Sequence, residues 1–70
     1  MKRRRVTSSS LRSVGYDESA KILEIESQNG RVYRYYDVPR DVYEELMNAE
    51  SLGSYFVENI RDNFRYSREA

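Results

Sequence analysis

The feature that most constrains the fold is a pair of alternating segments joined by a short turn, KILEIES-QNG-RVYRYYDV, residues 21–38. In the first segment Leu23 and Ile25 alternate with glutamates, which is the period of a strand with one apolar and one polar face. Asparagine and glycine in the turn tolerate the positive φ that tight hairpins require. The second strand ends before a proline, which cannot donate to a ladder. The sequence therefore predicts an antiparallel hairpin.

Two registers of this hairpin are compatible with the pattern, and they place its tyrosines on opposite faces. With a two-residue turn, Tyr33 and Tyr35 share the glutamate face and are exposed. With a three-residue loop, Ile25 lies opposite Tyr33, and Glu24 lies opposite Arg34. The second register gathers the apolar side chains on one face and forms a cross-strand ion pair, so the sequence favours it. Tyr33 and Tyr35 are then structural residues of the core.

The flanking segments extend the hairpin into an α+β domain. SSLRSVGYD predicts a preceding strand with a bulge at Gly15. Pro39 suits the first turn of a helix, and apolar residues then recur at helical spacing over residues 42–47. Ser51 is a candidate N-cap for a second helix. We therefore expect a three-stranded antiparallel β-meander followed by two α-helices packed on one sheet face.

Residues 8–64 are expected to form the one domain, because 70 residues lie near the lower limit for a chain that folds alone. We expect residues 1–7 to form a flexible basic arm, since they contain four successive basic residues. We expect residues 65–70 to form a frayed tail. Twelve basic residues less those four leave eight against twelve acidic ones. Bulk charge therefore gives no argument for nucleic-acid binding by the folded part.

Cysteine and histidine are both absent from the sequence. Their absence excludes disulfides, thiolate metal sites and a Ser-His nucleophile pair. We accordingly expect no catalytic residue, no metal and no cofactor, and a protein that is not an enzyme. No apolar run approaches the ~20 residues of a membrane span, and none follows the basic start as in a signal peptide. The sequence indicates a protein of the reducing cytoplasm.

RNA is one candidate partner. Arg3, Arg4 and Arg5 form a short basic run of the kind that neutralises phosphates. Arg34 and Tyr36 are predicted on the outer face of the sheet, where single-stranded RNA readers stack bases on aromatic rings. Two glutamates share that face and oppose the hypothesis. The alternative is a protein–protein interaction module with no nucleic-acid role, which uses an open sheet edge or an apolar patch.

Three segments in order, SSLRSVGYD, LEIESQNGRVYRYYDVP and AESLGSYFVENIR, resemble the KTSC domain. This short bacterial module occurs at the C-terminus of some lysyl-tRNA synthetases and as a stand-alone small protein. The resemblance covers residues 8–61 and places the central Tyr-x-Tyr of the family on Tyr33 and Tyr35. It implies no established activity, although the synthetase fusion suggests binding of RNA, specifically tRNA. Ser27 departs from the family pattern, which often has a large apolar residue there, and the basic start lies outside the resemblance.

Overall fold

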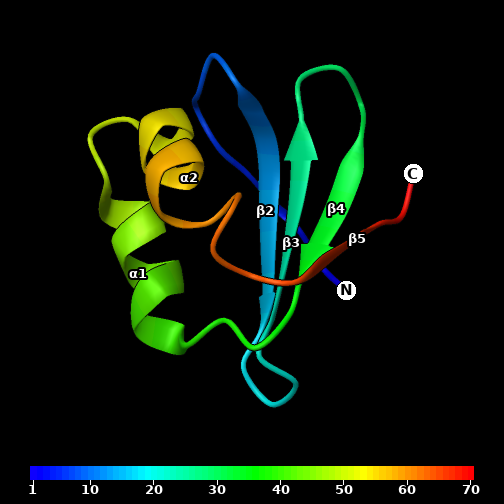
Figure 1. Ribbon diagram of the computed structural model, residues 1–70. Coiled ribbons are helices and arrows are strands. Elements are labelled where there is room, and N and C mark those ends of the chain that lie inside the picture. The colour runs from blue at the N-terminus through cyan, green and yellow to red at the C-terminus, as the bar shows by residue number, and fades with distance from the viewer.

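The computed structural model describes residues 1–70 as a five-stranded antiparallel sheet with two helices on one face (Figure 1). The strands are β1 (Arg4–Arg5), β2 (Leu11–Asp17), β3 (Ile22–Ser27), β4 (Val32–Tyr35) and β5 (Tyr66–Arg68), and the helices are α1 (Arg40–Asn48) and α2 (Leu52–Asn59). Strand order in the sheet follows the chain, and both helices lie between β4 and β5 in sequence. The α+β class is confirmed, but the sheet has five strands where the sequence predicted three.

The two additional strands come from the chain ends. In β1, Arg4 lies opposite Val14 of β2. In β5, Tyr66 lies opposite Tyr35 of β4. The structure differs here from the flexible arm expected for residues 1–7 and the frayed tail expected for residues 65–70. Neither end has the apolar alternation of a strand. Each pairs because β2 and β4 would otherwise leave a row of backbone donors and acceptors unpaired at an edge of the sheet.

The β3–β4 hairpin adopts the register with the three-residue loop, which confirms the prediction. Glu24 lies opposite Arg34. The backbone N–H of Ser27 donates to the carbonyl of Arg31 with an N···O distance of 2.9 Å. Gly30 has a φ of 88°, the left-handed conformation that a side chain would strain. The hydrophobic pattern and the turn chemistry therefore agree on one register.

The predicted bulge at Gly15 is wrong, because the irregularity of β2 lies between Leu11 and Ser13. Gly15 pairs regularly with Glu24. A different constraint acts on Gly15: a Cβ at this position would lie 2.8 Å from the carbonyl oxygen of Lys2. The glycine thus admits the close approach of the N-terminal segment to the outer face of β2.

The core lies between the helices and the sheet face that they cover. Its buried side chains come from the segments between the two edge strands: Leu11, Val14, Leu23, Ile25, Tyr35, Val38, Leu46 and Ile60. Tyr33 is partly buried beside this cluster. Both tyrosines of the Tyr-x-Tyr pair therefore face the helices, as the favoured register predicted.

The two helix starts differ in how well the sequence predicted them. Pro39 was predicted in the first turn of α1, but it is the N-cap, with an extended ψ of 154°. The helix begins one residue later, at Arg40. Ser51 caps α2 as predicted, since its hydroxyl accepts from the backbone N–H of Ser54 at 3.2 Å. Neither helix has the length and apolar character needed to cross a bilayer.

Candidate nucleic-acid interface

The sheet face turned away from the helices carries linked charged side chains. Alternation along the strands places Glu24, Glu26 and Arg34 on this face. Glu24 lies at its centre with a side chain only 5% exposed. Its carboxylate accepts a hydrogen bond from Nε of Arg34 at 2.9 Å and another from Arg3 of the N-terminal segment. The sequence predicted the Arg34 partner, but the second arginine depends on where β1 docks.

The carboxylate of Glu24 stays ionised at this buried position. Burial acts to raise its pKa, but the hydrogen bonds and charges of Arg34 and Arg3 outweigh burial and hold the pKa below the usual value of glutamate. The single negative charge of Glu24 is therefore shared by Arg3 and Arg34, both of which the sequence predicted to contact RNA. The charge of Arg34 is further offset by Glu69, whose Oε1 lies 3.9 Å from Nη1.

Tyr36 occupies the same outer face and is also engaged within the chain. Its hydroxyl is hydrogen-bonded to that of Ser67, with 2.7 Å between the oxygens. The guanidinium of Arg65 lies 5.1 Å from the centroid of its ring, a cation–π contact that covers one side. A base can stack on this ring only at its other side or by displacing Arg65.

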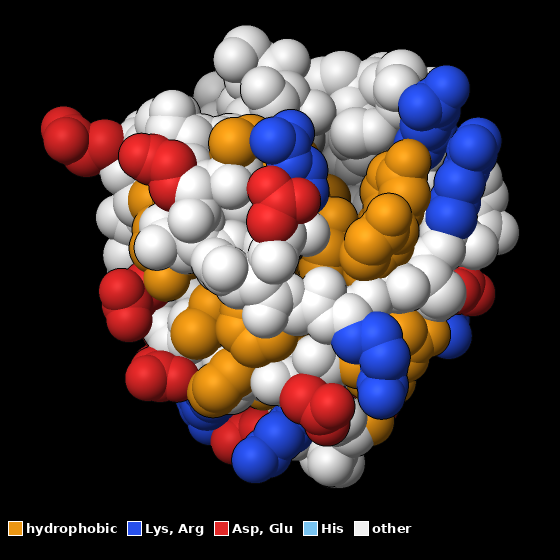
Figure 2. All heavy atoms as spheres, viewed as in Figure 1, with side chains coloured by type: hydrophobic (Ala, Val, Ile, Leu, Met, Phe, Trp, Pro, Cys, Tyr) orange, Lys and Arg blue, Asp and Glu red, His pale blue; other side chains and the backbone are white.

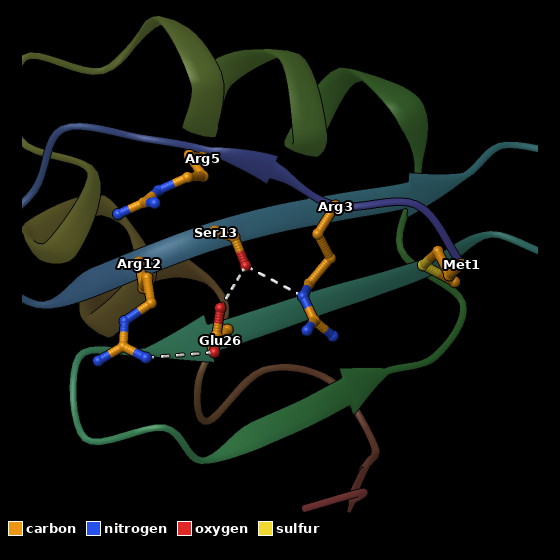
Figure 3. A pocket seen from close by; sticks show the side chains of 6 residues that line it. All are labelled: Met1, Arg3, Arg5, Arg12, Ser13 and Glu26. Carbon is orange, nitrogen blue, oxygen red and sulfur yellow. Dashed lines mark hydrogen bonds and ion pairs between the residues drawn. The ribbon is translucent and has the colours of Figure 1, made fainter.

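The structure divides the three arginines of the N-terminal run. Arg3 and Arg5 lie on the outer face with Arg12, where they border a hollow of about 470 Å³ (Figure 3). Arg4 lies on the other side of β1 and lines a second surface depression with Tyr16 and others, which Arg3 also borders. Of the three arginines predicted to contact phosphate, Arg3 and Arg5 therefore border the hollow and Arg4 does not.

Ser13 and Glu26 form the acidic and polar part of the same hollow. The Ser13 hydroxyl donates to Oε1 of Glu26 at 2.8 Å and accepts from Nε of Arg3 at 3.0 Å. Arg12 approaches the second carboxylate oxygen at 3.6 Å, whereas Arg5 belongs to none of the ion pairs. In Figure 3 the guanidinium groups of Arg5 and Arg12 extend toward the same end of the hollow. Guanidinium groups in this arrangement suit a phosphate anion.

No three acidic side chains of the structure lie close enough together to hold a metal ion. The charged groups of the outer face are arginines and glutamates that are partly paired within the chain.

Comparison with known proteins agrees with the fold and the residue pattern. A model of the KTSC domain family matches residues 7–64. A protein of Stutzerimonas stutzeri is 46% identical over 69 residues, which are 97% of both chains. The crystal structure of a KTSC domain protein from Yersinia pestis superposes with a TM-score of 0.93 and 33% identity, over 99% of this chain and 97% of that one.

Lysine–tRNA ligases contain a segment similar to this chain. The ligase of Trichormus variabilis is 42% identical over 53 residues, which are 76% of this chain and 9% of the ligase. The ligase of a Nostoc species is 37% identical over 58 residues, 83% of this chain and 10% of the ligase. The chain thus spans about a tenth of the length of these ligases. From the extent of the family match and of the similarity to the shorter relatives, the chain belongs to the KTSC domain family.

Proposed function

We propose that this KTSC domain is a non-enzymatic accessory module that binds RNA, with tRNA as the favoured partner. The observation that carries the proposal is the hollow bordered by Arg3, Arg5 and Arg12 on the outer sheet face. The similar segment in lysine–tRNA ligases supports it, because those enzymes act on tRNA by name.

Arg5 and Arg12 would make the first phosphate contacts. Arg5 is exposed and has no carboxylate partner, so binding an anion breaks no existing interaction. The Arg12–Glu26 pair spans 3.6 Å with the Arg12 side chain 42% exposed. An exposed pair of this kind contributes ~0–1 kcal/mol and is readily exchanged for a phosphate. Arg3 and Arg34 are held by Glu24, so they shape the surface more than they supply free charge.

The test is binding of a mixed tRNA preparation, followed by fluorescence anisotropy at about 50 mM and about 200 mM salt. Arg5→Gln combined with Arg12→Gln should weaken binding by ~10-fold or more at the lower salt. Losing two phosphate contacts should also reduce the salt slope by about one to two units. The matched control is Lys21→Gln with Arg40→Gln, which removes two positive charges remote from the hollow and should change affinity less than ~2-fold.

Two results would contradict the proposal. One is the absence of tRNA binding by the wild-type protein at the lower salt. The other is an equal loss of affinity in the control variant, which would reduce the interaction to net charge without a site.

The alternative function, a protein–protein interaction module, is favoured by one observation. β5 is an edge strand of the sheet, and its first residue, Tyr66, has a side chain exposed enough to meet a partner. Binding of this kind buries apolar surface, so it would persist between the two salt concentrations while tRNA binding falls steeply.

A further inference from the structure

An aromatic pocket lies on the helix-covered side of the sheet, open to solvent between α2 and β5. It holds about 260 Å³. Leu11 and Ile25 of the core form its floor, and its walls are four rings from β4, α2 and β5: Tyr33, Tyr35, Phe56 and Tyr66. Figure 2 views this side of the molecule and shows hydrophobic side chains around a hollow beside the helical layer. Neither the arginine hollow nor the Tyr36 surface shares a residue with it.

The four rings hold one another in position. Tyr35 meets Phe56 edge to face, with centroids 5.5 Å apart at 80°, and Tyr33 meets Tyr66 at 5.9 Å and 66°. Tyr66 also lies 5.7 Å from Tyr35. Despite these contacts Tyr66 is 56% exposed, so much of its surface is free for a partner. The packed rings thus preorganise the pocket, and Tyr66 offers an aromatic ring at its mouth.

The hydroxyl of Tyr35 is a nearly buried donor without a partner in the chain. The residue is 3% exposed, and its hydroxyl, unlike those of Tyr16 and Tyr36, makes no hydrogen bond within the chain. No fully enclosed polar side-chain atom lacks a partner, so the small exposed area of Tyr35 includes its hydroxyl. Because the Tyr35 ring lines the pocket, this hydroxyl opens into it.

Burial raises the pKa of Tyr35 to about 12, with further contributions from Tyr33 and Tyr66 beside it. The hydroxyl therefore remains protonated near neutral pH and can donate a hydrogen bond. Because the hydroxyl reaches the open pocket, water can pair with it in the free protein, and an acceptor atom of a ligand can replace that water.

Charged side chains lie at the rim of the pocket and beside it. Arg61 and Asp62 line it, but Nε of Arg61 lies 4.0 Å from the carboxylate, the limit of an ion pair. Arg68 lies opposite Tyr33 in the β4–β5 ladder, so it belongs to the same sheet face beside the pocket, and its Nε donates to the carbonyl oxygen of Ala70 at 3.2 Å. The guanidinium of Arg61 in the aromatic lining, with Arg68 beside Tyr33, suits a ligand that joins a planar apolar body to an anion.

From these features we propose that the aromatic pocket binds the base of one unpaired nucleotide of the RNA. Tyr66 stacks on the base, the Tyr35 hydroxyl donates to a ring nitrogen or carbonyl oxygen, and Arg61 and Arg68 contact adjacent phosphates. An apolar side chain of a protein partner would fill the walls but would leave the Tyr35 donor and both arginines unused. The inference rests on the proposed RNA-binding function and assigns it a base-reading site.

The base pocket and the arginine hollow lie at the same end of the sheet on opposite faces. In β3, Ser27 of the pocket directly follows Glu26 of the hollow, and Leu11 of the pocket pairs with Ser27. Successive residues of a strand point to opposite faces. A single strand of RNA that crosses this end of the sheet can therefore reach both sites.

The experiment titrates the isotope-labelled protein with short single-stranded homopolymers of adenylate, cytidylate and uridylate at low salt, with anisotropy for affinities. Tyr66→Ser should weaken binding by ~5-fold or more, because base–aromatic stacking is lost. Tyr35→Phe keeps the ring and removes only the hydroxyl, so it should weaken binding by about 5-fold without unfolding the core. Tyr36→Ser tests the outer face as the competing stacking surface. The matched control is Val57→Ser, an exposed apolar residue of α2 outside both sites, with an expected change below ~2-fold.

An abasic oligomer of the same length is the matched ligand, since it keeps the phosphates and removes the bases. It should bind the wild-type protein more weakly and should not distinguish Tyr66→Ser from the wild type.

The outcomes separate this inference from the function on which it rests. If the wild-type protein binds tRNA and oligomers, but Tyr66→Ser and Tyr35→Phe bind as tightly as it does, the base pocket is refuted and RNA binding stands. If Tyr36→Ser loses the affinity instead, the outer face reads the base and the pocket assignment is again wrong. If the wild type binds no RNA of either kind, the proposed function itself fails.

Discussion

Replacing Glu24 by Gln should loosen the N-terminal strand and destabilise the whole domain. The carboxylate is 5% exposed and joins Arg3 of the N-terminal segment to Arg34 of β4, so one residue links both sides of the outer face. Breaking a buried ion pair costs ~3–5 kcal/mol when the remaining charge has no access to water. Here the two arginine side chains are 31% and 36% exposed and can be rehydrated. We therefore expect a loss of ~2 kcal/mol.

The measurement is urea and thermal unfolding followed by circular dichroism. For a domain of this size ~2 kcal/mol corresponds to a fall in Tm of roughly 8–16 °C. The matched control is Glu44→Gln, which breaks the exposed pair with Arg40 and should cost no more than ~0.5 kcal/mol. Hydrogen exchange should show faster exchange of the β1 amides in Glu24→Gln than in the control.

The same carboxylate predicts an acid dependence with a definite sign. The folded-state pKa of Glu24 is lowered, so its contribution is complete above the unfolded value of about 4.3 and is lost as pH falls through the folded value. The wild type should lose more stability than Glu24→Gln below about pH 4. A variant as stable as the Glu44→Gln control, with an unchanged acid profile, would refute the bridging role of Glu24.

Three further substitutions or titrations test other parts of the structure. Gly15→Ala should cost ~1–3 kcal/mol in urea unfolding, because its Cβ would lie 2.8 Å from the Lys2 carbonyl oxygen. Deleting residues 1–3 should abolish most of that cost, and an unchanged cost would place the strain elsewhere. Ser51→Ala should lower stability by ~1 kcal/mol through loss of the α2 cap, while Ser51→Asp retains it; equal melting of the two variants would contradict the capping role. In an alkaline absorbance titration Tyr35 should ionise at about pH 12, and its burial should stabilise the fold below about pH 10 and progressively less above it; ionisation of all tyrosines near pH 10 in the folded protein would contradict its burial.

Local signals in the sequence were sufficient for the centre of the fold. The alternation in residues 21–38 selects the hairpin register, because a slip by one residue would move every apolar side chain to the outer face. Ser51 predicts a helix start through a hydrogen bond to Ser54, three residues away. Each of these interactions joins residues close in sequence, so the pattern that specifies it can be read directly from the chain.

The candidate site was predictable only where it belongs to the hairpin. Arg34 and Tyr36 lie on the outer face as the register requires, and Glu24 pairs with Arg34 as predicted. Their engagement by partners such as Arg3 and Arg65 was not predictable, since those residues come from the chain ends. Nothing in a short basic run or a polar tail indicates that it will pair with a particular strand.

The sequence by itself thus determined the α+β class, the hairpin, the helix order and the inward direction of Tyr33 and Tyr35. The tertiary structure alone decided that both ends become edge strands, that Arg3 binds Glu24, and that Tyr66 joins the Tyr-x-Tyr pair around a pocket. The physical reason is the separation along the sequence over which each interaction acts. Periodicity and turn chemistry act over a few residues, whereas the edges of β2 and β4 exist only after the sheet has formed, and it is these edges that recruit the two ends of the chain.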